Sequence, residues 1–295
     1  MVINMYDFVL FGGDIRQIYM ATYFRNVGYT VLTYGLSHPM IHDICKQASS
    51  LTEALHSGTI LVGPIPLSKD NDTIPSLTSS SDLNINILMD GLHSEQILFA
   101  GMVSPCITNL CKEKGILVYD FLKEDSLAIA NGIATAEGAI MEAISKGSGN
   151  LHKASVLVLG FGRCAKVLAH KLDGLDACLT ICARKDSDLA YADALGYQTC
   201  SFCELSSKIN DFDYIFNSVP FMVLPKELLC YISKETVIID IASYPGGLDY
   251  TAAKELGLNV SLSLGIPGKV APKASGEILA NYCLKKTFYR KKGFT

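Results

Sequence analysis

One stretch, residues 154–172, constrains the fold more than any other part of the chain. An apolar run from Val156 to Leu159 is typical of a buried parallel strand, and it passes directly into the pattern G-x-G-x-x-A and an amphipathic helical segment. Gly160 permits the tight reversal, Gly162 lets the backbone approach a pyrophosphate, and Ala165 lets the helix pack closely on the strand. The pattern predicts a dinucleotide-binding turn, with the phosphates at the N-terminus of the helix.

The second predicted strand of this region, Ala177 to Ala183, bears on the choice of dinucleotide. NAD-selective sites usually carry an Asp or Glu about 20 residues past the first glycine, where it binds the ribose 2′-hydroxyl. Here the strand end is followed by Arg184 and Lys185, with Ser187 at the start of the next helix. Because a guanidinium can hold a phosphate by two hydrogen bonds, these residues favour NADP(H) over NAD(H). The alternative is a solvated basic residue at a strand end.

Composition is that of an ordinary globular α/β enzyme. The chain has 295 residues, which is long enough for two domains, and 49% of them are hydrophobic while 18% are charged. A net charge of −4 without a basic patch argues against nucleic acid as a partner. No apolar stretch is expected to be long enough to span a membrane, and no signal peptide is expected at the N-terminus. A cytoplasmic protein without a membrane partner is therefore predicted.

The first half alternates predicted strands with helical or loop segments, as in a parallel sheet. The strands are expected near residues 8–11, 30–34, 59–62, 97–100 and 116–119. The turn Gly12-Gly13-Asp14-Ile-Arg16 resembles a dinucleotide turn but lacks the third small residue in register. Residues 1–125 are therefore predicted to form a substrate domain, with a C-terminal helix at about 274–295 packing back on it. The polar segment 64–86 is expected to be a surface excursion rather than a loop over a site.

A helix over residues 126–147 is predicted to connect the two halves. Its polar residues Asn131, Thr135 and Glu137 could face a substrate or the nicotinamide. The alternative is capping, with Thr135 as an N-cap and Gly132 ending a preceding helical turn. Glu137 stands among apolar residues, which favours a functional role. Asn131 and Glu137 are therefore the candidate catalytic residues.

Residues 148–273 are predicted to form a Rossmann-type NADP-binding domain. Each of its strands ends in a Gly, Pro or polar loop, and open α/β sheets bind ligands at this carboxyl edge. The expected fold class is thus α/β, with two parallel-sheet domains, the second a Rossmann fold, and a cleft between them. The candidate cofactor-binding residues are Gly160, Gly162, Arg163, Arg184, Lys185, Ser187, Asn217, Val219, Pro220 and Gly265.

Neither the cysteines nor the histidines indicate a metal site. Most of the ten cysteines lie in apolar segments, where a reduced, buried thiol is expected (Cys45, Cys106, Cys111, Cys178, Cys182, Cys230 and Cys283). Cys200 and Cys203 form a C-x-x-C pattern without further ligands at zinc spacing or a thioredoxin-like context. His38 and His42 are four residues apart, but Pro39 between them suits only the first turn of a helix. No metal is expected.

The motifs taken together resemble those of one family, the A subunit of dipicolinate synthase from spore-forming bacteria. They extend over nearly the whole chain: Gly12-Gly-Asp14-x-Arg16, Asn131-x-x-x-Thr135-x-Glu137-Gly138, Gly160-x-Gly162-Arg163, Ala183-Arg184, Asn217-Ser-Val-Pro220, Asp240-Ile-Ala-Ser243-x-Pro245-Gly-Gly247-x-Asp249 and Gly265-Ile-Pro267-Gly268-x-x-Ala271-Pro272. The family commonly has Gly at the position of Ala165, and the fingerprint tolerates this substitution.

The resemblance implies oxidation of dihydrodipicolinate to dipicolinate, pyridine-2,6-dicarboxylate, during sporulation, and the flavoprotein-like B subunit of dipicolinate synthase as a partner. Removal of a hydride and a proton makes the ring aromatic, so the step needs positioning more than a strong acid or base. The small dicarboxylate substrate needs cations or N–H donors, and the candidate substrate-binding residues are Asp14, Arg16, Ser243 and Lys269. Arg16 and Lys269 could alternatively be surface charges.

Two other functions stay open. One is an NADP-dependent dehydrogenase for another small acid, such as a 2-hydroxyacid or a shikimate-like acid. It is disfavoured because His152 and His170 lie before the first strand and on the helix of the glycine turn, away from a nicotinamide. The other is a non-catalytic NADP-binding subunit whose partner does the chemistry. The oligomeric state, including a homo-oligomer, is also left open.

Overall fold

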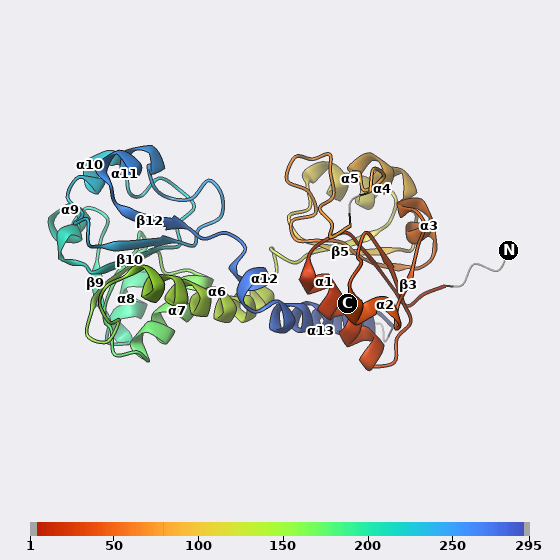
Figure 1. Cartoon of the computed structure of the whole chain (residues 1–295), viewed down its shortest axis with the longest axis horizontal. Coiled ribbons are helices and arrows are strands. Elements are labelled where there is room, and N and C mark those ends of the chain that lie inside the picture. The colour runs from red at the N-terminus through yellow and green to blue at the C-terminus, as the bar shows by residue number, and fades with distance from the viewer. Residues whose placement is uncertain (1–4, 79, 292–295) are drawn as a thin grey trace. The chain divides into compact units, whose positions relative to one another are not determined.

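The computed structural model describes residues 5–78 and 80–291, which fold into two α/β units (Figure 1). The first unit contains the residues up to Ala128 and the segment from Ala271 onward, and the second is Ile129–Val270. Each unit has a six-stranded sheet whose strand pairs are parallel. The predicted α/β class with two parallel sheets is confirmed, and the cleft between the domains stays a prediction.

The first sheet runs in the order β3-β2-β1-β4-β5-β6. Its strands are Lys46–Gln47 (β3), Val31–Tyr34 (β2), Phe8–Phe11 (β1), Ile60–Val62 (β4), Ile97–Ala100 (β5) and Leu117–Asp120 (β6). All residues of β1, β2 and β5 are buried, as expected for parallel strands covered on both faces. Strand β3 was not predicted, because its two exposed residues carry no hydrophobic period.

Helices cover both faces of the first sheet. One face packs against α1 (Ile15–Asn26), α2 (Pro39–His42) and α13 (Pro272–Lys291), and the other packs against α3 (Leu51–His56), α4 (Ile85–Gly91) and α5 (Pro105–Glu113). Helix α13 lies tightly on α1, since a Cβ on Gly276 would come 2.7 Å from the carbonyl oxygen of Arg16. Helix α13 therefore completes the hydrophobic core that includes β1.

The second sheet runs in the order β12-β11-β10-β7-β8-β9. Its strands are Asn259–Leu262 (β12), Val237–Asp240 (β11), Tyr214–Asn217 (β10), Ser155–Leu159 (β7), Cys178–Cys182 (β8) and Gln198–Cys200 (β9). From β7 the chain builds outward to β8 and β9, and then crosses back to place β10 on the other side of β7. The strand order thus reverses between β7 and β10, and open α/β sheets bind ligands at the carboxyl edge of such a point.

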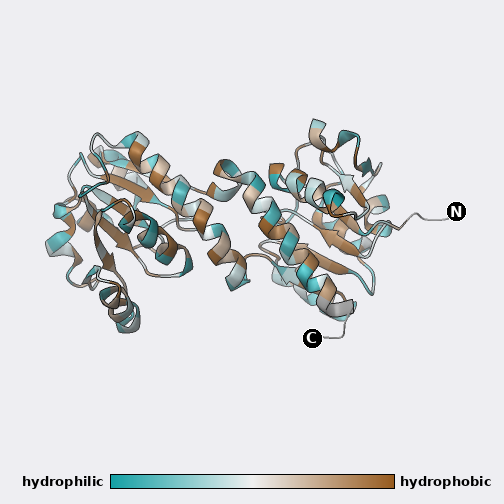
Figure 2. Cartoon of the chain, turned by 90° about the horizontal axis from the view of Figure 1, so that it is seen from below, coloured by the Kyte–Doolittle hydropathy of each residue, from teal (hydrophilic) through white to brown (hydrophobic). Residues whose placement is uncertain are grey.

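The second sheet is also covered on both faces. One face packs against α6 (Asp125–Lys146), α7 (Arg163–Asp173), α8 (Asp186–Ala194) and α12 (Ile266–Val270), and the other packs against α9 (Leu205–Lys208), the 3-10 turn η1 (Ile209–Asp211), α10 (Lys226–Leu229) and α11 (Tyr250–Leu256). Figure 2 shows mainly hydrophobic strands and helices of mixed character. Burial of apolar side chains against the strands holds these layers together.

Helix α6 runs without interruption through Gly132. Thr135 is not an N-cap, because it lies inside this helix and its hydroxyl donates to the Asn131 carbonyl one turn earlier, at 3.0 Å. By length and composition α6 could cross a membrane, so the expectation that no window has that length is wrong. In the described chain 44% of the apolar window is buried, and its residues Ala136, Ala139 and Ala143 belong to the core of the second unit.

Candidate functional site

The predicted glycine turn joins β7 to α7 at the point where the strand order reverses. Gly160 has a φ of 87°, and a Cβ there would come 2.7 Å from Ser218 Oγ and 2.8 Å from Val219 Cγ2, so only glycine fits. Gly162 is the N-cap of α7, makes no side-chain cap, and would present a Cβ to open space. Gly162 therefore adds no side chain at the start of α7, and helix N-termini of this kind bind anions through backbone N–H groups.

The basic residues after β8 lie beside this turn. The carbonyl of Cys182, the last residue of β8, accepts a 2.7 Å hydrogen bond from Gly160 N–H. Arg184, Lys185 and Ser187 follow and are exposed. Within the described residues Arg184 has no hydrogen-bond or ion-pair partner, whereas the acidic residue Asp188 in the first turn of α8 is paired with Lys166 at 4.0 Å. The guanidinium is thus available to a ligand phosphate.

Asn217, predicted as a cofactor ligand, has its side chain committed to the protein. The side chain is buried, and its Nδ2 donates to the Val219 carbonyl at 3.0 Å and to Asp240 Oδ1 at 2.9 Å. Its Oδ1 accepts from Val219 N–H at 3.0 Å. The Asn217 side chain therefore shapes the loop after β10, and a contact of Asn217 with the cofactor stays a prediction. Val219 and Pro220 remain accessible on this loop.

The side chain that organises the neighbouring loop is Asp240, at the end of β11. Its buried carboxylate accepts four hydrogen bonds, from Asn217 Nδ2 and Ala242 N–H on Oδ1 and from Gly247 N–H and the Tyr250 hydroxyl on Oδ2. Burial and the hydrogen bond to Asp240 raise the pKa of Tyr250 above its usual range, so Tyr250 stays a donor. We did not assign Asp240 a role from the sequence, although an Asp ending an apolar strand before Gly-Gly was a usable signal.

Three further predicted site residues lie beyond the ends of β11 and β12. Ser243 is exposed, and its carbonyl accepts from Gly246 N–H at 2.9 Å. Gly265 has a φ of 67° and directly precedes α12, which carries the exposed side chain of Lys269. All three therefore lie at the carboxyl edge of the second sheet, and Lys269 belongs to a different unit from Arg16.

Arg16 and Asp14 are tied to each other in the first unit. Asp14 is the N-cap of α1, accepts from Arg16 N–H at 2.9 Å, and forms a capping box with Gln17. The same carboxylate binds the Arg16 guanidinium, with Nη2 2.7 Å from Oδ2, and Nη2 also donates to the Ile65 carbonyl at 2.7 Å. The Arg16 side chain is only 11% exposed. Because Nε and Nη2 are engaged, only Nη1 is left to contact a substrate carboxylate.

The segment 64–86 is not a surface excursion. Its residues Leu67, Ile74 and Leu83 are buried, and it folds over the glycine turn of the first unit. The Pro75 carbonyl accepts from Gly13 N–H, and a Cβ on Gly12 would come 2.7 Å from that oxygen. In the first unit the chain itself, at Pro75, therefore fills the space beside the glycine turn. No room is left there for a pyrophosphate.

The two catalytic candidates on α6, Asn131 and Glu137, differ in their position relative to the glycine turn. Glu137 binds Lys171 Nζ at 3.0 Å, in the last turn of α7, which lies about 12 Å along the helix from Arg163. Asn131 precedes Gly132, whose Cβ would come 3.7 Å from the Cα of Cys164 in the first turn of α7. Glu137 is thus remote from the glycine turn, whereas Asn131 lies near it, and a catalytic role of either residue stays a prediction.

The cysteines and histidines do not gather around a ligand. All ten cysteines lie within the described residues and none forms a disulfide, and Cys106, Cys178 and Cys230 are exposed rather than buried as expected. Cys200 lies opposite Cys182 of the adjacent strand, and the two thiols form a hydrogen bond. This hydrogen bond, together with burial, raises the pKa of Cys182. No group of three potential metal ligands was found within the described ranges.

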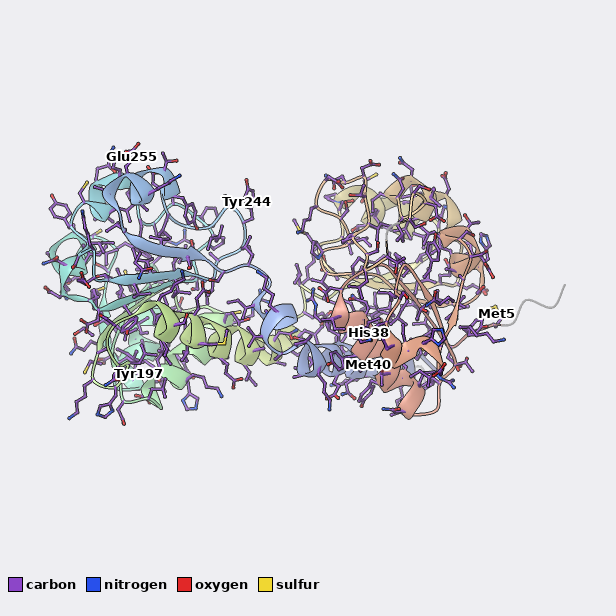
Figure 3. The ribbon with its side chains drawn as sticks, in the orientation of Figure 1. Met5, His38, Met40, Tyr197, Tyr244 and Glu255 are labelled. Carbon is purple, nitrogen blue, oxygen red and sulfur yellow. The ribbon has the colours of Figure 1, made fainter. Side chains whose placement is uncertain are left out.

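The histidines have local roles. His38 is the N-cap of α2, with Nδ1 accepting from Met40 N–H at 3.2 Å; both residues are labelled in Figure 3. His152 lies 3.3 Å from Asp176, but both precede their strands at the amino edge of the second sheet. This His–carboxylate pair is therefore at the wrong edge for a 2-hydroxyacid dehydrogenase.

Comparison with known proteins assigns the family. Residues 7–122 match the model of the N-terminal domain of the dipicolinate synthase A subunit. The chain is 33% identical over 197 residues to the dipicolinate synthase A subunit of Bacillus subtilis strain 168, and the alignment covers 67% of this chain and 66% of that protein. The chain belongs to the dipicolinate synthase A subunit family. The family resemblance indicated by the motifs is thus confirmed.

Solved structures of this family share the fold over almost the whole chain. The A chain of dipicolinate synthase from Bacillus subtilis matches with a TM-score of 0.87 and 25% identity, covering 100% of this chain and 99% of that one. The A subunit from Bacillus halodurans matches with a TM-score of 0.83 and 24% identity, covering 97% and 99%.

More distant matches show the fold alone. A transhydrogenase from Sinorhizobium meliloti has a TM-score of 0.66 at 11% identity and covers 96% of this chain and 94% of that one. An L-alanine dehydrogenase has a TM-score of 0.63 at 15% identity and covers 96% and 90%. The architecture thus resembles that of these two proteins.

Proposed function

We propose that this chain acts in dipicolinate synthesis as an NADP(H)-dependent dehydrogenase that oxidises dihydrodipicolinate to pyridine-2,6-dicarboxylate. The family assignment supports the pathway, because the relatives are named as subunits of dipicolinate synthase. The observation that carries the redox part is the glycine turn, where the start of α7 faces open space at Gly162. A site of this kind fits the pyrophosphate of a dinucleotide.

Each group of residues has a role in this proposal. The N–H groups at the start of α7 bind the pyrophosphate, and Arg184, Lys185 and Ser187 bind the 2′-phosphate of NADP(H). The loop around Val219 and Pro220, held in place by Asn217 and Asp240, lines the nicotinamide half of the crevice.

The reaction itself demands orientation. Dihydrodipicolinate loses a hydride from one ring carbon and a proton from its neighbour, and NADP⁺ supplies the hydride acceptor, so the products are dipicolinate, NADPH and a proton. Aromatisation drives the step, so binding and alignment of the ring are the main tasks of the protein. In the proposal Lys269 binds a substrate carboxylate and Asn131 orients the substrate near the start of α7, while Arg16 Nη1 of the first unit stays a predicted carboxylate ligand.

The direct test measures NADP⁺ reduction with freshly made dihydrodipicolinate, with and without the B subunit, the partner that membership in a subunit family implies. We expect NADPH and dipicolinate in equal amounts from the chain itself. Product formation only with the B subunit, together with tight NADP(H) binding, would instead favour a non-catalytic NADP-binding role. Reduction of NADP⁺ with other small acids, but not with dihydrodipicolinate, would favour a different dehydrogenase.

Replacing Arg184 with alanine should weaken NADP(H) binding selectively. Charge-assisted hydrogen bonds contribute about 1.5–3 kcal/mol, so the dissociation constant for NADP(H) should rise at least about tenfold. The constant for NAD(H) should change little, because NAD lacks the 2′-phosphate. Lys254→Ala, an exposed lysine in the last turn of α11, is the matched control. Equal losses for both nucleotides would contradict the 2′-phosphate assignment.

Replacing Arg16 with alanine should lower kcat/KM for dihydrodipicolinate by roughly tenfold or more, because a charge-assisted contact to a substrate carboxylate is lost. Nucleotide affinity should stay unchanged, since the glycine turn belongs to the other unit.

The Arg16 result needs a control, because the same guanidinium binds Asp14 and the Ile65 carbonyl. Asp14→Asn removes the charge pair but leaves the Arg16 side chain present. A purely structural role would lower the thermal midpoint of both variants without changing kcat/KM of the folded protein, and that outcome would remove Arg16 from the substrate site.

A further inference from the structure

Large apolar side chains stand exposed at the carboxyl edge of the second sheet. Phe221 and Met222, in the loop after β10, are 73% and 60% exposed, and Tyr244, in the loop after β11, is 81% exposed. Tyr244 extends away from its loop in Figure 3. Scattered exposed apolar residues are normal, so the meaning of these side chains depends on where and how they are held.

The backbone that carries Tyr244 is tightly held. Asp240 accepts from Ala242 N–H at 2.9 Å and from Gly247 N–H at 2.7 Å, one on each side of Tyr244 in the sequence. Gly246 N–H donates to the Ser243 carbonyl at 2.9 Å, which closes the turn around Tyr244. An exposed ring on a fixed backbone loses little conformational entropy when it binds a partner.

The loop after β10 is joined to the loop after β11. Val223 N–H and Leu224 N–H both donate to the Gly247 carbonyl, at 2.9 and 3.0 Å. A Cβ on Gly247 would come 2.6 Å from the Val219 carbonyl oxygen, so the two loops pack without a gap. Phe221 and Tyr244 are therefore carried by one rigid pair of loops.

This pair of loops lies next to the glycine turn, on the side away from Arg184. Ser218 N–H and Ser218 Oγ both donate to the Leu159 carbonyl, at 3.0 and 2.9 Å, directly before Gly160. A dinucleotide with its 2′-phosphate at Arg184, beyond β8, and its pyrophosphate on α7 would place the nicotinamide on the β10 side of β7. The ring that exchanges a hydride with it must then lie near the two loops.

We propose that Tyr244 stacks on the ring of the substrate and product. This inference rests on the proposed function and adds the residue that recognises the ring. The ring nitrogen makes the pyridine ring of the product electron-poor, and the negative face of a phenol ring favours such a partner in offset stacking. Stacking distinguishes a planar ring from a saturated one, which carboxylate-binding cations alone do not.

The experiment compares two ligands, pyridine-2,6-dicarboxylate and its saturated analogue piperidine-2,6-dicarboxylate, by calorimetric titration of the full chain with NADP⁺ present. The variants are Tyr244→Ala, Tyr244→Phe and, as the matched control, Tyr231→Ala. Tyr231 is 60% exposed and lies two residues after the end of α10. Tyr244→Ala should weaken the planar ligand about tenfold and the saturated one less than about threefold, in line with loss of an aromatic pair and its buried area. Tyr244→Phe and Tyr231→Ala should bind both ligands like the wild type.

Equal weakening of both ligands, no weakening of either, or a loss of NADP⁺ affinity in Tyr244→Ala would overturn the stacking role. A wild-type chain that binds NADP⁺ but neither ring would contradict the proposed function, and with it this inference. A wild-type chain that binds both rings equally would leave the proposed function standing and overturn only the stacking role.

Discussion

Replacing Gly162 with valine is expected to abolish NADP(H) binding while the chain keeps its fold. The φ of Gly162 is −82°, which valine adopts without strain, and a Cβ there meets no protein atom within 4 Å. The valine side chain would instead occupy the space that the pyrophosphate needs. Losing two or more hydrogen bonds to the charged phosphates, at about 1.5–3 kcal/mol each, should raise the dissociation constant by about a hundredfold or more.

Titration with NADPH and circular dichroism during heating test this expectation together. Gly149→Val is the matched control, because Gly149 also faces open space but lies before β7, at the amino edge of the sheet. Gly160→Val is the contrasting variant, since its positive φ and its contact with Val219 should make it unstable. Tight NADPH binding by Gly162→Val would mean that the loop is only a structural turn.

Replacing Asp240 with alanine is expected to destabilise the second unit by about 3–5 kcal/mol. The change removes the acceptor from four donors, and a buried donor left unpaired costs about 1–3 kcal/mol. The expected loss of stability is smaller than the sum for four unpaired donors, because the loops can relax and admit water. NADP(H) and substrate binding should weaken as well, because both loops beside the nicotinamide half of the proposed site lose their anchor.

Urea unfolding measures the effect, with the transition of the second unit followed separately because the two units need not unfold together. Tyr250→Phe removes a single hydrogen bond to Asp240 and should cost about 1 kcal/mol. A change below about 1 kcal/mol for Asp240→Ala would be incompatible with the four-donor network.

Several elements of the fold were predictable because their causes are local. The strand β7 and the start of α7 follow from an apolar run, two glycines and a helical period, all within one continuous segment. A parallel strand buried on both faces is a nearly uninterrupted apolar run, so β1 and β5 were located to the residue. The two-residue strand β3 had no such signal and was missed.

The hydrogen-bond and ion-pair partners of individual polar side chains could not be predicted in the same way. Asn217 binds an aspartate 23 residues away, Arg16 a carbonyl 49 residues away, and Glu137 a lysine 34 residues away. All three had been predicted from the sequence as candidate site residues. Which of them is free to meet a ligand depends on partners that only the folded chain brings within hydrogen-bond distance.

The sequence by itself therefore determined the layered α/β architecture, the glycine turn and the family. The hydrophobic period and the positions of the glycines determine structure within a few residues, so they can be recognised in the sequence alone. The tertiary structure alone decided that segment 64–86 fills the first glycine turn, that Asp240 anchors the loops after β10 and β11, and that Tyr244 is left exposed on a fixed backbone. These features depend on contacts between segments far apart in the sequence, and such contacts exist only once the sheet has brought its strand ends together at one edge.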